Sequence, residues 1–430
     1  MSDSPRRPVS RASLGWLFAV ALLLRLVVLV AADTPGEAAG RTPWEWGGEA
    51  PTLAAALAEG RGYGDPWGHD TGPSSWLTPP YPWLVAQAMR LGGGVTPTTA
   101  WILFALQSLV SAWTCVLIAQ LGRRLGQAPA GLLGGWLFAI YPVALWNATG
   151  VVWDTTLVAC GVTLFLNVLL ARGPAPRGAV LSGLCFGGLL FLNPAPVSLV
   201  PAVLAWLFLQ RGRRAWTSAA AFLAAAVLVC LPWMLRNQRE LGTLQLRPNF
   251  GAELRMGNHD GAHGRPVPWR THPSHVEAEL ASYRELGEAG YGRANLRRAL
   301  DWIRAHPRAF MGLSVHRVQL FWVGQLPGAD PRRSGNVDPG ADPASWLKFL
   351  VFGLTGAGAL VALFWVELRR PDRILLIGTL MMFGLPYYLT YVSERYRFPV
   401  DPVILLLDGW LILRLVRPAL ARHISPGGIS

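Results

Sequence analysis

The sequence predicts an all-α polytopic membrane protein. Of its 430 residues, 52% are hydrophobic and only 15% are charged, whereas soluble domains typically carry about 25% charged residues. Mean hydropathy is +0.33. Several apolar runs are about 15–23 residues long, which is the length that a helix needs to cross a bilayer core. We therefore expect a bundle of about ten transmembrane helices, with interfacial helices on the outer face and a small extracytoplasmic segment.

The positive charge and the cysteines agree with a membrane location. The net charge is +13, and many arginines lie in short loops beside apolar runs, where positive charge kept on the cytoplasmic side sets the orientation. We therefore expect membrane lipids as partners, and no nucleic acid. The cysteines have no metal-site or CxxC spacing and are interpreted as small core residues: Cys115, Cys160, Cys185 and Cys230.

The N-terminal transmembrane module is expected to cover residues 1–235. Three arginines precede the apolar run 13–32, so we expect a retained first helix that runs from inside to outside. Arg25 interrupts this run and faces either the bundle interior or a lipid headgroup. The later spans expected in this module are 99–121, 131–147, 151–171, 178–192, 195–209 and 216–235.

The outer loop 33–98 follows the first span and is too polar to cross a bilayer. Residues 49–59 (EAPTLAAALAE) favour a short helix, with Pro51 in its first turn. Residues 80–91 (PYPWLVAQAMRL) predict a second short helix, which is too short to span and is placed along the interface. The loop also carries carboxylates at the expected membrane surface, which makes it the first candidate for chemistry: Glu45, Glu49, Asp65 and Asp70.

The polar segment 236–324 is expected to form the small extracytoplasmic part. Its first part is rich in Gly, Pro and Asn, which predicts loop and short strand. Residues 275–306 resemble two amphipathic helices, and 307–324 an interfacial helix that contains His316 and Arg317. The C-terminal part, 325–430, is expected to add spans at 345–367, 373–391 and 400–418.

With this orientation, the notable polar groups all collect on the outer face. Random placement would scatter them over both faces of the membrane. Their collection on one face therefore predicts a reaction site at the outer membrane surface. The groups are the four loop carboxylates, Asp154, Arg236 with Asn237, residues 247–258 and residues 394–397.

Six stretches carry a resemblance to a known superfamily. They are GGEAPTLAAALAEGRGYGDP, TGPSSWLTPPYPWLVA, VVWDTT, PWMLRNQRELG, RPNFGAELRMGN and ERYRFPVDP, and the resemblance covers the chain from about residue 16 to residue 410. In their order and membrane context they resemble the GT-C superfamily of polyprenyl-phosphate-sugar-dependent glycosyltransferases. Within it, the chain looks like the group that includes protein mannosyltransferases and lipid A aminoarabinose transferases.

The resemblance implies a GT-C-like bundle and a glycosyltransferase. Its donor would be a polyprenyl-phosphate-linked sugar, its acceptor a glycan, lipid or protein, and its active site would face outwards from the bacterial plasma (inner) membrane. The resemblance also implies inversion at the anomeric carbon. Members of the group often carry an Asp-Glu pair in the first outer loop, and this chain has Gly48-Glu49 there. The catalytic role therefore carries over to Glu49 alone.

Transfer from a lipid-phosphate sugar needs a base for the acceptor hydroxyl and cations for the departing phosphate. Glu49 is the expected base, and Asp154 is expected to position the acceptor or the base. No cofactor follows from the sequence, and a divalent metal ion stays open. The expected binding residues are Arg395, Arg397 and Arg236 for the donor phosphate, Trp76 and Tyr81 at the lipid or sugar entrance, and Asn249, Glu253 and Asn258 for substrate.

Each assignment has a purely structural alternative. Glu49 also suits the positive start of the 49–59 helix, and Asp154 suits a helix cap. Arg395 and Arg397 also suit anchors for lipid headgroups, and the polar residues of 247–258 suit turns. The spacing of the loosely clustered histidines fits no tight zinc pattern: His259, His263, His272 and His275.

Three other functions remain open at this point. A polymerase or ligase of surface polysaccharide would use a diphosphate-linked donor at the same outer site. A transporter or lipid flippase predicts buried mid-membrane charge and paired repeats, and no convincing repeat is visible. A non-catalytic scaffold would present the 236–307 segment. The sugar, the acceptor and the oligomeric state do not follow from the sequence.

Overall fold

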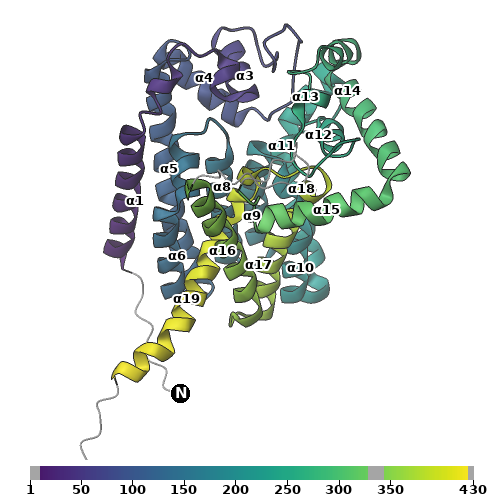
Figure 1. Cartoon of the computed structure of the whole chain (residues 1–430). Coiled ribbons are helices and arrows are strands. Elements are labelled where there is room, and N and C mark those ends of the chain that lie inside the picture. The colour runs from purple at the N-terminus through teal and green to yellow at the C-terminus, as the bar shows by residue number, and fades with distance from the viewer. Residues whose placement is uncertain (1–9, 328–342, 425–430) are drawn as a thin grey trace, which may run out of the picture.

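The computed structural model describes residues 10–327 and 343–424, and throughout these ranges the chain is helical or irregular. Figure 1 shows the long helices side by side, with α3, α4 and α12–α14 gathered at one end. The all-α prediction is confirmed. The main helices are α1 (Arg11–Ala31), α5 (Pro97–Arg124), α6 (Ala128–Ile140), α7 (Pro142–Thr149), α8 (Thr155–Arg172), α9 (Pro176–Leu192), α10 (Val200–Arg211), α11 (Ala215–Leu241), α16 (Pro343–Trp365), α17 (Arg370–Phe383), α18 (Leu385–Leu389) and α19 (Asp401–Ile424).

Fewer stretches meet the requirements for a membrane span than the sequence predicted. Within the described ranges, five are long and apolar enough, or six if the bent pair α6–α7 counts as one, against about ten expected. One of the five, Ala195–Leu241, holds both α10 and α11. The difference arises because apolar runs do not always form long helices: α9 has 17 residues and α17 has 14. α19 corresponds to the predicted span 400–418 but contains two carboxylates, Asp401 and Asp408, which make it less suited to cross a membrane.

The predicted span 131–147 is broken into two helices, and Arg25 binds backbone carbonyl groups at the break. α6 ends at Ile140 and α7 starts at Pro142, with a bend of 56°. Proline has no N–H, so the helix cannot satisfy the Phe138 carbonyl in the usual way. The Arg25 guanidinium lies 3.3 Å from Phe138 O, 3.3 Å from Ala139 O and 2.8 Å from Ala21 O, and donates to all three. Arg25 is fully buried, so it faces the bundle interior and not a headgroup.

Glycines allow α5, α6 and α19 to pack closely. A Cβ on Gly131 would lie 2.7 Å from Gly122 Cα, and one on Gly134 would lie 2.7 Å from Leu406 Cα. Contacts of this kind are typical of helix packing within membranes, where small residues let backbones approach. One core of buried side chains joins these three helices to α8 and α9.

The outer loop 33–98 forms the short helices that the sequence predicted. They are α3 (Glu49–Ala58) and α4 (Pro80–Gly92), preceded by α2 (Pro43–Gly47). Gly48 joins α2 to α3 with φ of 72°, a left-handed conformation that favours glycine. This turn places Glu49 at the first position of α3.

The first part of the segment 236–324 contains short helices where loop and short strand were expected: α12 (Phe250–Gly257) and α13 (Pro268–Thr271). The helices expected further along the segment are present as α14 (Glu277–Ala305) and α15 (Pro307–Trp322). The strand prediction is wrong for the described residues, whose bridge pairing is limited to Gly64 with Pro73. A kink at Gly287 divides α14 into the two amphipathic helices that were predicted. Beside it, Glu288 accepts hydrogen bonds from Ser74 Oγ at 2.5 Å and Ser75 N at 2.7 Å, which fixes the outer loop against α14.

Candidate active site

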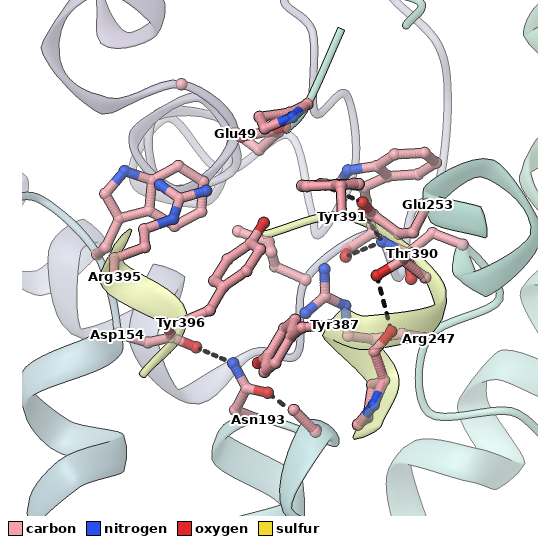
Figure 2. Close-up of a pocket in the computed structure, with 18 of the residues that line it drawn as sticks. Glu49, Asp154, Asn193, Arg247, Glu253, Tyr387, Thr390, Tyr391, Arg395 and Tyr396 are labelled. Carbon is pink, nitrogen blue, oxygen red and sulfur yellow. Dashed lines mark hydrogen bonds between the residues drawn. The ribbon is translucent and has the colours of Figure 1, made fainter. Parts of the chain in front are cut away.

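A cavity of about 600 Å³ lies where the outer loop, α12 and the segment after α17 meet. Figure 2 shows its side chains pointing towards one another from these separate elements. Six of the predicted site residues line it: Glu49, Trp76, Asp154, Asn249, Glu253 and Arg395. The structure thus brings together residues that lie up to 346 positions apart in the sequence (395 − 49).

Glu49 is the least restrained carboxylate of the cavity. Its side chain is 14% exposed, and in the described part of the chain no other side chain is recorded as donating a hydrogen bond to it. Among the described residues, His272 is the titratable side chain within 4 Å of it, with Nε2 at 3.6 Å from Glu49 Oε1. Burial raises the pKa of Glu49 above its ordinary value, although Arg395 and Arg247 oppose this. A carboxylate with a raised pKa and free lone pairs is suited to accept a proton.

Asp154 stands at the start of α8 but does not cap it. No capping hydrogen bond forms; its Oδ2 accepts from Asn193 Nδ2 at 2.8 Å, across the break that follows α9. Asn193 is itself oriented, because its Oδ1 accepts from the Ala195 N–H at 3.0 Å. Burial raises the pKa of Asp154. The side chain is therefore aimed at the cavity by a neighbour, which the capping alternative does not explain.

Glu253, on α12, is held on both oxygens. Asn249 Nδ2 donates to Oε1 at 3.1 Å, and the Tyr391 hydroxyl donates to Oε2. Two further tyrosines, Tyr387 and Tyr396, stack with ring centroids 4.3 Å apart. They line the same wall of the cavity. This wall presents phenol hydroxyls and an acidic group that is already paired.

Two guanidinium groups line the cavity without an acidic partner. Arg395 lies flat on Trp153, 3.7 Å from the ring centroid. Arg247 enters from the loop before α12, and its buried Nε has no hydrogen-bond partner. Within residues 10–327 and 343–424, no carboxylate oxygen is recorded within 4 Å of either side chain. Unpaired arginines inside a partly closed cavity are suited to bind an anion such as phosphate.

Four predicted site residues do not line this cavity. Arg397 is fully buried and bonded within the bundle. Arg236 donates to Ser74 O at 2.7 Å and Tyr63 O at 3.0 Å, so it holds the outer loop. The Tyr81 hydroxyl donates to Gln107 Oε1 at 2.8 Å inside the bundle. Asn258 Nδ2 donates to Leu389 O at 2.8 Å and so joins α12 to α18. Each of the four uses polar side-chain atoms to hold the fold.

Several lining residues were not assigned by sequence reasoning. The signals available were weak: an Arg within a polar stretch, an Asn at a helix break, and tyrosines at the end of an apolar run. The unassigned residues include Trp44, Trp153, Asn193, Arg247, His272, His275, Tyr387, Tyr391 and Tyr396.

The cavity does not present a metal-ligand set. Among the described residues, no group of three or more His, Cys, Asp or Glu side chains is placed to hold a metal ion. Asp154 and Glu253 each accept hydrogen bonds from neighbours, so the carboxylates are dispersed and partly engaged. The positive charge at this site comes instead from Arg247 and Arg395.

Comparison with known proteins reveals the fold. No family model and no curated protein matches the chain. Solved structures of the oligosaccharyltransferase from Archaeoglobus fulgidus do match. The apo form matches with a TM-score of 0.55 and 13% identity over 97% of this chain and 52% of that one. A complex with Zn and sulfate matches with a TM-score of 0.54 and 13% identity over 95% of this chain and 50% of that one. The enzyme AglB in complex with an inhibitory peptide and a dolichol-phosphate matches with TM-score 0.50, 14% identity, 94% of this chain and 52% of that one.

These matches carry information about architecture. This chain spans about half the length of the oligosaccharyltransferases it matches. At such identities the likeness concerns the fold alone, and the residues of the cavity carry the argument about activity. The chain shares the fold of these oligosaccharyltransferases, in agreement with the GT-C-like bundle that the resemblance implied.

Proposed function

We propose that this chain is a membrane glycosyltransferase that transfers a sugar from a polyprenyl-phosphate donor to an acceptor hydroxyl. One observation carries the proposal: a largely buried carboxylate, to which no described side chain donates a hydrogen bond, shares a cavity with two guanidinium groups that lack an acidic partner. These are the groups that the reaction needs, a base for the acceptor and cations for the leaving phosphate. The GT-C fold and the dolichol-phosphate bound by one matching protein support the same donor class.

The transfer is a direct displacement. The acceptor O–H gives its proton to the Glu49 carboxylate while the acceptor oxygen forms a bond to the anomeric carbon. The bond between the anomeric carbon and the phosphate oxygen breaks, and the phosphate leaves with the electron pair. Attack opposite to the leaving group inverts the anomeric configuration. Glu49 is suited to this step because burial raises its pKa towards the operating pH.

Arg395 and Arg247 bind the donor phosphate and stabilise its charge as it leaves. Arg247 replaces Arg397 and Arg236 in the role that the sequence assigned to them. Trp153 supports the Arg395 guanidinium from below, 3.7 Å away. A pre-oriented cation stabilises developing charge without reorganisation during the reaction. Asp154 and Glu253, each held by an amide, accept hydrogen bonds from sugar or acceptor hydroxyls.

An apolar opening supports a lipid-linked donor over a soluble sugar nucleotide. Val197 and Phe250 both line the cavity, yet they are 54% and 48% exposed. They lie at the break after α9 and at the start of α12. A prenyl chain can therefore leave the cavity over exposed apolar surface while its phosphate stays beside the arginines.

The distribution of arginines supports an extracytoplasmic site in the plasma membrane. α8 begins beside the cavity at Asp154 and ends at Arg172. Near that far end, Arg124 Nε of α5 donates to Asn167 Oδ1 at 3.0 Å. α5 and α8 therefore direct basic residues to the end of the bundle opposite the cavity. Basic loops are retained in the cytoplasm, which supports a cavity on the other side.

The decisive experiment is Glu49→Gln in purified protein supplied with labelled sugars on short polyprenyl phosphates. Glutamine keeps the size but cannot accept the proton, so kcat should fall about 10²–10⁴-fold while donor binding is retained. Glu59→Gln, an exposed change near the end of the same helix, is the matched control and should leave turnover unchanged.

Equal turnover in Glu49→Gln and wild type would contradict the assignment of the base. Turnover with diphosphate-linked donors alone would instead identify the polymerase or ligase reaction. Movement of intact lipid-linked substrate across liposomes, without transfer, would identify a transporter.

A further inference from the structure

The imidazole of His272 is fixed beside Glu49. His272 follows the last residue of α13 and is 6% exposed. Its ring packs edge to face against two indoles. The ring centroids are 4.8 Å apart with an interplanar angle of 84° for Trp67, and 5.7 Å apart with an angle of 82° for Trp76. These contacts restrict rotation of the ring. Its Nε2 lies 3.6 Å from Glu49 Oε1.

The hydrogen bonds of the other ring nitrogen define the tautomer. The backbone N–H of Ser274 lies 3.3 Å from His272 Nδ1. A backbone N–H can only donate, so Nδ1 accepts and the ring proton of the neutral imidazole lies on Nε2. Ser274 Oγ lies 2.5 Å from the same Nδ1 and donates to it as well. The N–H of Nε2 is thereby directed to the side on which Glu49 lies.

His272 is neutral in this position. Burial lowers its pKa to about 4, with Glu253 opposing and His275 adding to the shift. The contact with Glu49 is then a neutral donor facing a carboxylate, and not an ion pair. A lysine or arginine at this position would stabilise the carboxylate strongly and make it a poorer base. A neutral N–H orients the same oxygen at a much smaller cost in basicity.

We propose that His272 is the positioning residue of the base: its neutral N–H faces the Glu49 carboxylate across 3.6 Å and favours one orientation of that carboxylate while leaving it basic. The assignment of Glu49 as base rests on the proposed function, whereas the coupling between the two side chains does not. The other charged or titratable groups that act on Glu49 are Arg247, Arg395 and His275. All three are unchanged in the variants below, so a shift in the titration of Glu49 reports on position 272.

The coupling is measured without turnover by the reaction of Glu49 with dicyclohexylcarbodiimide, which requires a protonated carboxyl group. Labelling at Glu49 is followed by mass spectrometry as a function of pH. His272→Lys adds a charge and should move the labelling midpoint down by about 1 pH unit or more. His272→Phe removes the donor and should move it up. His272→Gln keeps an N–H donor and should keep the midpoint near that of wild type.

The exposed His306 supplies the matched control, since His306→Lys and His306→Phe should leave the midpoint unchanged. Unchanged midpoints in both His272→Lys and His272→Phe overturn the proposal, as do shifts of both in the same direction. If His272→Phe does not fold, the labelling midpoints of His272→Lys and His272→Gln are compared with each other, and equal midpoints overturn the proposal.

The pH dependence of kcat/KM separates this proposal from the proposed function. A base must be ionised, so the acidic limb should follow the labelling midpoint, to lower pH in His272→Lys and to higher pH in His272→Phe. Shifted labelling without turnover on any donor supports the role of His272 and contradicts the transferase. Normal turnover with unshifted labelling supports the transferase and overturns the role of His272.

Discussion

Arg395 and Arg397 lie two residues apart and have opposite environments. Arg395 lies on Trp153 in the cavity, with no carboxylate oxygen recorded within 4 Å in the described chain. Arg397 is fully buried, and each of its five N–H groups has an acceptor. An arginine whose donors are all engaged holds a fold, whereas an arginine left unpaired in a cavity is available to a ligand.

The region around Arg397 joins four parts of the bundle. Its Nε donates to Asp401 Oδ1 at 2.9 Å, at the start of α19. The remaining donors reach Tyr141 at the α6–α7 break, Trp322 at the end of α15, and Phe352 and Thr355 in α16. Around Arg395, in contrast, polar side chains line a cavity and are not all paired with one another. Three predictions test whether this contrast is correct.

The largest expected effect is on folding. Arg397→Met leaves Asp401 as an uncompensated buried charge, and breaking a buried pair in this way typically costs about 3–5 kcal/mol. We expect little folded protein, or a large drop in the midpoint of thermal unfolding in detergent. The double variant Arg397→Met with Asp401→Leu removes both charges and should recover part of the loss. An Arg397→Met protein as stable as wild type would contradict the structural role.

Arg395→Met should affect ligand binding and not folding. A charge-assisted hydrogen bond contributes about 1.5–3 kcal/mol, so affinity for a polyprenyl-phosphate donor should fall about 10–100-fold. The unfolding midpoint should stay close to that of wild type. Arg304→Met, at a side chain that is 73% exposed, is the control and should change neither quantity. Loss of folding in Arg395→Met would remove the contrast with Arg397.

The features predictable from sequence are those set by local composition. The helix class follows from apolar runs, and the short helices at 49–59 and 80–91 follow from their own residues. Glu49 could be chosen as a candidate because it stands in a polar loop beside an apolar anchor and matches a family position, and it does line the cavity. The predicted number of membrane spans was too high because the mean hydropathy of a stretch does not reveal a helix break such as the one at Tyr141–Pro142.

The remaining site could not be predicted because side-chain partners are set by tertiary structure. Nothing local distinguishes Arg395 from Arg397, since the difference comes from acceptors at the α6–α7 break and on α15, α16 and α19. Arg247 and His272 belong to a segment about 200 residues from Glu49, and only the fold brings them to it. The domain boundaries at 235 and 324 remain predictions.

The smallest expected effect is a gain in stability when the unrestrained carboxylate is removed. Burial raises the folded-state pKa of Glu49 above the unfolded value of about 4.3. A raised carboxyl pKa destabilises the fold as pH increases: the cost is absent below the unfolded pKa and grows until pH passes the folded pKa. Glu49→Gln should therefore unfold at nearly the wild-type temperature at pH 4, and at a higher temperature at pH 7.

Thermal unfolding in detergent at several pH values measures this difference, with Glu59→Gln as the exposed control that shows no trend. In the Glu49→Gln protein the new amide oxygen still faces the N–H of His272, so the substitution removes the charge and keeps the contact. A Glu49→Gln protein that is less stable than wild type at pH 7 would mean that the carboxylate is held by the fold as Asp401 is. The cavity would then be a second structural cluster, and the distinction drawn between Arg395 and Arg397 would not extend to the base.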